Sequence, residues 1–168
     1  MADLWHHYLS RYHAQMTASP ALTKCTTGAT VFCIGDLGSQ TIVEGANTAD
    51  VDLGRAARAA MFGGTFSLWL HHWWGFLEKA GHVCVPVAAN GSAVPNTLFK
   101  LFWDQTFSAL LFNAGYIAAA NCEEGASIEH MKECIEQQLP DQMVAHWKFW
   151  PLFHFMNFTF LPLHYRVV

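Results

Sequence analysis

The chain has 168 residues, of which 52% are hydrophobic and only 13% are charged, and its mean hydropathy is +0.17. Because an average soluble domain carries about 25% charged residues, this composition favours an integral membrane protein with a single domain over residues 1–168. The formal net charge of −4 lacks the basic excess of a nucleic-acid-binding protein, and no run of Lys or Arg provides a polybasic patch for a membrane surface.

Two elements are expected in the first quarter of the chain. Residues 3–16 are predicted to form an amphipathic helix in the membrane interface, with an apolar face made of Leu4, Trp5, Tyr8, Leu9 and Tyr12. This segment has no basic region followed by an apolar core, so it does not read as a secretory signal. The first membrane span is expected over residues 22–43, with Asp36 and Gln40 inside it.

The second span is expected over residues 56–78, which contain the uncharged stretch AAMFGGTFSLWLHHWWGFL. Ala59, Gly63 and Ser67 recur at every fourth position in this segment. Small residues at this spacing allow helix backbones to approach closely in lipid, so they indicate a helix-packing face.

The third span is expected over residues 97–121, where Asp104 and Gln105 precede a long uncharged stretch. Residues 127–146 read as a second amphipathic helix. It should lie outside the hydrocarbon because charged residues are costly at mid-bilayer depth, and it carries Glu129, Glu133 and Glu136.

The fourth span is expected over residues 147–165, the most informative part of the sequence. Aromatic side chains occur all around this segment, so nearly every face must be buried in protein or face lipid. Pro151 and Pro162 would each remove a backbone hydrogen bond, which membrane helices tolerate where neighbours satisfy the freed groups. A fully buried helix of a soluble protein is the alternative. The sequence as a whole favours an all-α integral membrane bundle of four transmembrane helices plus amphipathic helices.

Asp36 and Asp104 are carboxylates within apolar segments. An ionised carboxylate facing lipid costs at least ~2.5 kcal/mol, so both should face the bundle interior or water. One interpretation is a polar lining for a solute path. The other is internal pairing, of Asp104 with Lys100 one helical turn earlier and of Asp36 with Arg55 or Arg58.

Motifs of catalytic or metal chemistry are absent from the sequence. The five cysteines include no C-x-x-C pair, which argues against a disulfide framework and against zinc-ligand spacing. No H-x-x-x-H or H-E-x-x-H occurs among the histidines, and there is no G-x-S-x-G motif or phosphate-binding glycine loop. We therefore expect no metal, no cofactor and no enzymatic activity.

Short motifs follow one another along the whole chain in the order LWxxYL, PxxTK, GDxxxQ, DxxRxxR, KxxxDQ and WxxWPxxHxxNFxxxPxxxR. Their order resembles that of the Mpv-seventeen / 22 kDa peroxisomal membrane protein family. His154 stands where that family has glutamine, and Ser67-Leu68 stands where it has Gly-Pro. The proline that follows the family's Asp-Gln pair and the family's tail are missing. The chain is thus expected to be a divergent or C-terminally shortened member.

The resemblance implies a four-span protein of the mitochondrial inner membrane, or alternatively of the peroxisomal membrane. It also implies a function as a weakly selective channel for small solutes. The pore-lining or buried polar candidates are Asp36, Gln40, Asp104, Gln105 and Asn157, and their charge partners are Lys24, Arg55, Arg58, Lys100 and Arg166.

The missing Gly-Pro and the abundant aromatic residues favour an alternative function, a non-catalytic accessory subunit of a larger mitochondrial inner-membrane complex. The expected partners are membrane lipid and either other subunits of such a complex or further copies of this chain. Nucleic acid is not expected as a partner.

Overall fold

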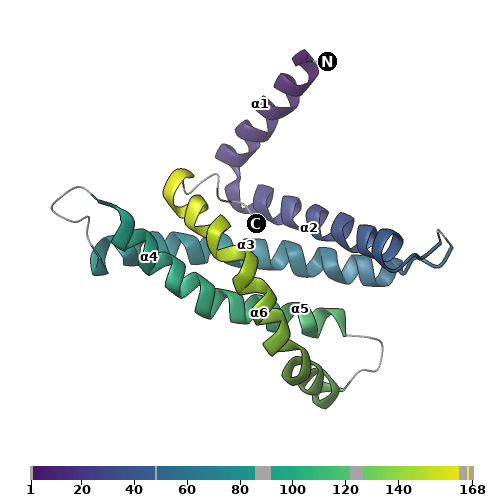
Figure 1. Cartoon of the computed structure of the whole chain (residues 1–168). Coiled ribbons are helices and arrows are strands. Elements are labelled where there is room, and N and C mark those ends of the chain that lie inside the picture. The colour runs from purple at the N-terminus through teal and green to yellow at the C-terminus, as the bar shows by residue number, and fades with distance from the viewer. Residues whose placement is uncertain (1, 48, 86–91, 122–126, 163–165, 167–168) are drawn as a thin grey trace.

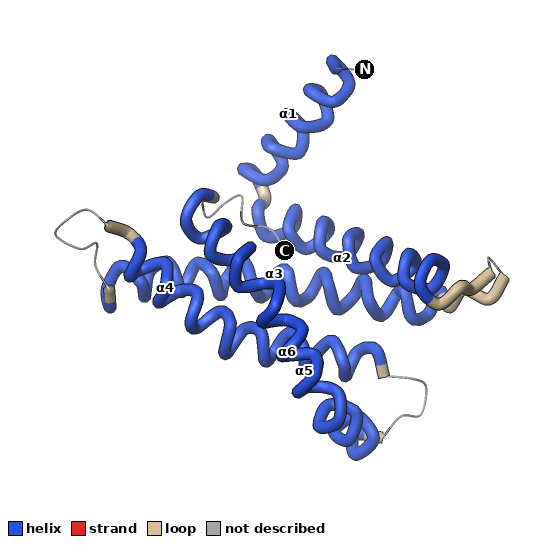
Figure 2. Tube along the Cα trace, viewed as in Figure 1, coloured by secondary structure: helices blue, strands red, loops and turns tan. Residues whose placement is uncertain are grey.

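A computed structural model describes residues 2–47, 49–85, 92–121, 127–162 and 166, and all regular structure within these ranges is helical (Figure 1, Figure 2). This confirms the prediction of an all-α chain. Helices α2, α3 and the α4–α5 segment run alongside one another as a layer, and α6 crosses this layer (Figure 1). Helix α1 projects away from the other helices (Figure 1).

The first two helices are separated by a single residue, Ser19. Helix α1 spans Ala2–Ala18 and includes the expected amphipathic segment, although the side chains of Leu4, Trp5 and Leu9 lie outside the described residues. Helix α2 spans Pro20–Gly38. Proline suits this first helical position because the backbone N–H that it lacks would have no partner within the helix. The chain continues into a π-helical turn, η1, over Ser39–Val43.

Helix α3 spans Leu53–Cys84 and packs lengthwise against α2. It begins at Asp52, whose side chain accepts a hydrogen bond from the backbone N–H of Arg55 at 2.9 Å, a typical N-cap. The two helices are in close contact at Gly28 and Gly63, where a Cβ added to either glycine would lie 2.7 Å from the carbonyl oxygen of the other. Gly63 and Ser67, from the predicted ridge of small residues, therefore form part of this contact.

The third expected span corresponds to three consecutive helical elements. Helix α4 covers Val94–Trp103, the π-helical turn η2 covers Asp104–Ser108, and α5 covers Ala109–Ala120. Such π-helical turns are rare and often lie at functional positions in a helix. Here the two π-helical turns contain Gln40, Asp104 and Gln105, three of the predicted buried polar residues.

The C-terminal part of the chain differs from the prediction. A single helix, α6, runs from Ile128 to Phe160 where an amphipathic helix over 127–146 and a separate span over 147–165 were expected. Pro140 and Pro151 both lie inside it, because the remaining backbone hydrogen bonds carry the helix past each proline. Leu161 has extended backbone angles, as the residue before a proline prefers, so Pro162 follows the helix. Residues 163–165 lie outside the described part.

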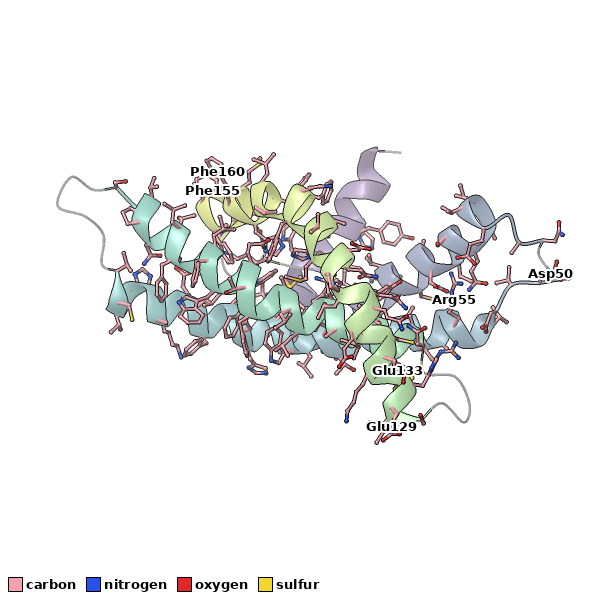
Figure 3. The ribbon with its side chains drawn as sticks, turned by 60° about the horizontal axis from the view of Figure 1, so that its bottom comes forward. Asp50, Arg55, Glu129, Glu133, Phe155 and Phe160 are labelled. Carbon is pink, nitrogen blue, oxygen red and sulfur yellow. The ribbon has the colours of Figure 1, made fainter. Side chains whose placement is uncertain are left out.

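The side chains of α6 change in character along its length. Glu129 and Glu133 lie in its first half, whereas Phe155 and Phe160 lie near its other end (Figure 3). None of the described helices combines the length and mean hydropathy that a candidate membrane span requires.

The apolar core is small and lies between α3 and α6, where Leu70, Trp74, Leu77 and Phe158 are buried together. Among the described residues, buried polar and charged side chains outnumber buried apolar ones, while large apolar side chains are exposed along α2, α3, α5 and α6. The distribution of polarity is thus the reverse of that in an ordinary water-soluble domain.

The close contact between α2 and α3 gives a first prediction. In Gly28→Ala the new methyl group would meet the backbone of Gly63 and the hydroxyl of Ser67, so the helices must move apart. We expect the free energy of unfolding in detergent to fall by about 1–3 kcal/mol. Gly38→Ala is the control, since a Cβ there meets nothing within 4 Å. Equal stability of the two variants would contradict the contact.

Candidate functional site

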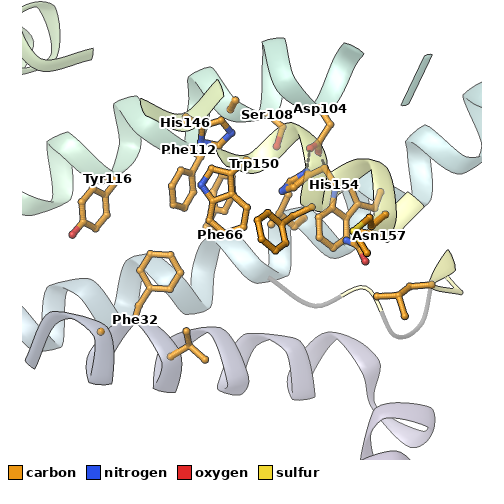
Figure 4. A pocket seen from close by; sticks show the side chains of 18 of the residues that line it. Phe32, Phe66, Asp104, Ser108, Phe112, Tyr116, His146, Trp150, His154 and Asn157 are labelled. Carbon is orange, nitrogen blue, oxygen red and sulfur yellow. Dashed lines mark hydrogen bonds and ion pairs between the residues drawn. The ribbon is translucent and has the colours of Figure 1, made fainter. Parts of the chain in front are cut away.

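A cavity of about 880 Å³ lies between α2, α3, α5 and α6 and is the candidate site. Most of its wall is apolar and aromatic, with Phe32 from α2, Phe66 from α3, and Phe112 and Tyr116 from α5. Figure 4 shows these rings facing a common space together with the side chain of Trp150 from α6. The polar side chains of the wall are few, namely Asp36, Asp104, Ser108, Gln142, His146, His154 and Asn157.

Helix α6 supplies most of these polar groups from a single face. Gln142, His146, Trp150 and His154 follow one another at intervals of four residues, and Asn157 comes three residues later. Residues at this spacing lie above one another on a helix. The sequence singles out Asn157, and His154 through the family signature, but not His146. The four-residue spacing upstream of residue 147 is the signal that could have revealed it.

Asp104 joins three elements of the fold. Its carboxylate is 1% exposed and accepts a hydrogen bond at 2.9 Å from the indole N–H of Trp74 on α3. The other oxygen contacts Nδ1 of His154 on α6 and accepts a weaker hydrogen bond from the amide of Gln105 at 3.4 Å. A carboxylate buried to this degree needs such donors to offset its lost hydration.

Lys100 does not pair with Asp104, so that part of the predicted pairing is wrong. Its ammonium lies 2.8 Å from Glu78 of α3, and Arg166 binds the other oxygen of Glu78 at 2.7 Å. Asp104 takes its donors from α3 and α6, and His154 is its ionisable partner among the described residues. Arg166 also lies over the ring of Phe158, 5.2 Å from the ring centroid.

Of the two partners considered for Asp36, Arg55 and Arg58, the structure pairs it with Arg55. Arg55 Nε lies 2.8 Å from the Asp36 carboxylate, and its remaining nitrogens bind Glu44 at 2.6 and 3.0 Å. These hydrogen bonds hold the pKa of the Glu44 carboxyl below its usual value and raise the pKa of Arg55. Arg58 instead lies 3.8 Å from Asp52.

Gln40 connects the end of α2 to the start of α3. Its amide nitrogen donates to Asp36 at 2.7 Å and to the carbonyl oxygen of Asp52 at 3.0 Å, while its oxygen accepts from the backbone N–H of Asp52 at 2.7 Å. All the hydrogen-bonding groups of this glutamine are therefore engaged in structural contacts.

The other predicted residues occupy different parts of the structure. Asn157 lines the cavity. Gln105 is buried but is not part of the cavity wall, and its amide oxygen has no partner among the described residues. Lys24 is 2% exposed near the start of α2, away from the cavity wall. Within the described ranges, no three or more His, Cys, Asp or Glu side chains gather in a way that could hold a metal ion.

His146 has one satisfied and one unsatisfied ring nitrogen. The amide nitrogen of Asn113 lies 3.3 Å from His146 Nδ1 and also donates to the carbonyl oxygen of Ala109 at 2.8 Å. The imidazole is 9% exposed, and its Nε2 has no partner in the described part of the chain.

Comparison with known proteins identifies the family. The chain is 30% identical over 161 residues to protein sym-1 of Neurospora crassa, a match that covers 95% of this chain and 88% of that protein. The chain belongs to the Mpv17 / PMP22 family. The model of this family matches residues 121–168. The resemblance inferred from the motifs is therefore confirmed.

Two further relatives support the assignment. Protein SYM1 of Saccharomyces cerevisiae is 27% identical over 165 residues, which cover 95% of this chain and 81% of the relative. The mitochondrial inner membrane protein Mpv17 of Danio rerio is 24% identical over 168 residues, with 99% and 88% covered. No solved structure matches the chain.

The Asp36 cluster gives a second prediction. Arg55→Gln removes the cation from a buried carboxylate, and we expect it to lower the free energy of unfolding by about 2 kcal/mol. This is less than the 3–5 kcal/mol of a fully buried pair, because Arg55 is partly exposed. Arg58→Gln is the matched control and should cost below about 1 kcal/mol, as for a surface pair. Thermal unfolding in detergent measures both, and a larger loss in Arg58→Gln would contradict the assignment.

Proposed function

We propose that the chain is an integral protein of the mitochondrial inner membrane in which the α2–α3–α5–α6 cavity forms part of a weakly selective path for small solutes. The cavity, whose wall includes the paired carboxylates of Asp36 and Asp104, is the observation that carries this proposal. Family membership supports the location, since relatives from Danio rerio and Drosophila melanogaster are named mitochondrial inner membrane proteins.

The reversed distribution of polarity supports a membrane setting. Exposed large apolar side chains would face lipid, while buried polar groups satisfy one another inside, as a low-dielectric surrounding requires. Arg55 and Glu78 anchor the two ion-pair clusters of α3. The stretch of α3 between Arg55 and Glu78 is about 34 Å long at 1.5 Å per residue. This length is close to the thickness of the hydrocarbon core of a bilayer, about 30 Å.

The cavity wall is suited to a weakly selective path. Its two carboxylates are already paired, because Asp36 binds Arg55 and Asp104 binds Trp74. Since the rest of the wall is mostly apolar, it would impose little chemical selection on a small solute.

A non-catalytic accessory subunit of a larger membrane complex is the second candidate. It is favoured because Asp36, Gln40 and Asp104 are all engaged in contacts that hold the bundle together. Exposed aromatic side chains on α4 and α6, including Trp103, Trp147 and Phe149, offer a surface for another chain.

Solute flux distinguishes the two candidates. Gly35 lines the cavity, and a Cβ at this position meets nothing within 4 Å, so Gly35→Phe would add a ring at the cavity wall without a clash at Cβ. We expect wild-type protein in liposomes to pass small sugars, measured as recovery from osmotic shrinkage, and Gly35→Phe to slow this recovery severalfold. Gly38→Phe is the control, because Gly38 is equally free of contacts but lies outside the cavity wall.

Wild-type flux no faster than that of empty liposomes would favour the accessory subunit. Equal flux through Gly35→Phe and Gly38→Phe would place the path elsewhere in the bundle.

The proposed membrane arrangement gives a prediction for cysteine accessibility. Cys134 lies in the acidic half of α6, which should be outside the hydrocarbon, while Cys33 lies within the first proposed span. In single-cysteine variants, an impermeant maleimide should label Cys134 from one side of the membrane and leave Cys33 unlabelled. Protection of Cys134 in opened membranes, or ready labelling of Cys33, would contradict this arrangement.

A further inference from the structure

Three side chains in the cavity wall carry hydrogen-bonding groups that the described part of the chain does not use. They are Ser108 of η2 and His154 and Asn157 of α6. The Ser108 hydroxyl, His154 Nε2 and the Asn157 amide form no hydrogen bond with any described residue. Each of these groups keeps accessible surface, whereas the unpartnered Nε2 of His146 is fully enclosed. A ligand in the cavity can therefore reach the first three groups but not His146 Nε2.

Ser108 is the most buried of the three residues, with 4% of its surface exposed. The hydroxyl of a serine or threonine within a helix commonly bonds to the carbonyl oxygen four residues earlier, as Thr106 does with Phe102 at 2.8 Å. Ser108 makes no such bond in the described structure. Because buried polar groups are nearly always hydrogen-bonded, the Ser108 hydroxyl indicates a partner that comes from outside the chain.

The contacts of His154 determine what its free nitrogen can offer a ligand. The carboxylate of Asp104 accepts a hydrogen bond from Trp74 through one oxygen and from Gln105 through the other. The second oxygen also contacts Nδ1 of His154. Since an ionised carboxylate can only accept, Nδ1 must donate. In the neutral imidazole, Nε2 then carries a lone pair and is a hydrogen-bond acceptor.

The three free groups lie in one region of the cavity wall. Ser108 comes four residues after Asp104, and Asn157 comes three residues after His154. The contact between Asp104 and His154 joins these two stretches of helix. Figure 4 shows the four side chains grouped together, apart from the ring of Tyr116. The cavity thus combines a local polar region with a wall that is otherwise mostly apolar.

The rest of the wall indicates an uncharged ligand with a flat ring. The carboxylates of Asp36 and Asp104 are already paired, and among the described residues no Lys or Arg lines the cavity. An ion entering this mostly apolar space would lose its hydration without compensation. The aromatic rings of Phe66, Phe112 and Tyr116 contribute to the wall, and such rings favour stacked or edge-on contact with another ring.

We propose that the cavity binds an uncharged aromatic alcohol, whose hydroxyl donates to His154 Nε2 and accepts from the Ser108 hydroxyl and the Asn157 amide. A hydroxyl has one donor and two acceptor sites, which match one acceptor and two donors on the wall. The ligand class refines the cavity of the proposed function and rests on that proposal. Binding requires no transport, however, so the two can be tested separately.

A pair of matched probes tests this inference. 2-Naphthol and 2-methylnaphthalene are flat two-ring molecules of nearly equal size, with a hydroxyl group in one and a methyl group in the other. Equilibrium dialysis against protein in lipid nanodiscs, corrected for uptake by empty nanodiscs, would measure both affinities relative to lipid. We expect wild-type protein to bind 2-naphthol about fivefold more tightly than 2-methylnaphthalene, as one neutral hydrogen bond allows.

Two variants assign this preference to the polar region. Ser108→Ala breaks no hydrogen bond in the described structure, so the fold should persist while the naphthol-to-methylnaphthalene affinity ratio falls by a factor of about two or more. Thr106→Val is the matched control, because it removes a hydroxyl from the same π-helical turn but outside the cavity wall. It should keep the wild-type ratio. His154→Leu removes the acceptor and should also lower the ratio, although it removes the contact with Asp104 as well.

Equal affinity of the wild type for both probes, or no binding of either, would overturn the inference, whether or not His154→Leu folds. An unchanged ratio in Ser108→Ala, or an equal fall in Thr106→Val, would overturn it too. Flux without this preference would leave the proposed function standing, whereas preference without flux would leave only the binding site.

Discussion

The burial of the Asp104 carboxylate is the constraint on which the arrangement of the helices depends. A carboxylate at 1% exposure must receive hydrogen bonds from the protein, because water cannot supply them. Its donors come from Trp74 on α3 and His154 on α6. The π-helical turn η2 begins at Asp104 itself, so the point at which the helix departs from regular geometry is also the point at which three elements meet.

The two ion-pair clusters extend the same principle to the ends of the bundle. Arg55 connects α2 to α3 through Asp36, and Glu78 connects α3 to α4 and to the C-terminal segment through Lys100 and Arg166. Apolar packing alone is limited to a small core between α3 and α6. Buried hydrogen bonds and ion pairs therefore specify which helices meet, and the outward-facing apolar side chains remain available for lipid. The cavity lies where α6 meets the layer of the other helices.

Local sequence patterns predicted the features that depend on local chemistry. Helical periodicity predicted an all-α chain. Because a charge that faces lipid is costly, we also predicted that Asp36 and Asp104 lie inside the helix bundle in a polar environment. The sequence also offered Arg55 and Arg58 as alternative partners of Asp36, and the structure pairs it with Arg55. The pairing of Lys100 with Asp104 failed because it rested on one-turn spacing within a helix. Lys100 instead pairs with Glu78, and Asp104 pairs with His154. Both partners belong to other helices, and their positions follow from tertiary packing.

The continuity of α6 and the role of His146 were missed for related reasons. Pro140 and the change from acidic to aromatic composition suggested two elements, but a proline within a helix removes one hydrogen bond without ending the helix. His146 fell at the boundary between these two expected elements, so its alignment with His154 and Asn157 on one face was not recognised. Its other neighbour, Asn113, contacts Nδ1 of the ring, and no local pattern relates these two residues.

A double-mutant cycle between Asp104 and His154 tests the central claim most directly. The free energy of unfolding would be measured in detergent for the wild type, Asp104→Asn, His154→Leu and the double variant. If the carboxylate and the imidazole hold α6 against η2, the two changes should be non-additive, with a coupling energy of at least about 1 kcal/mol. Losses that simply add, with a coupling near zero, would contradict the role of this pair.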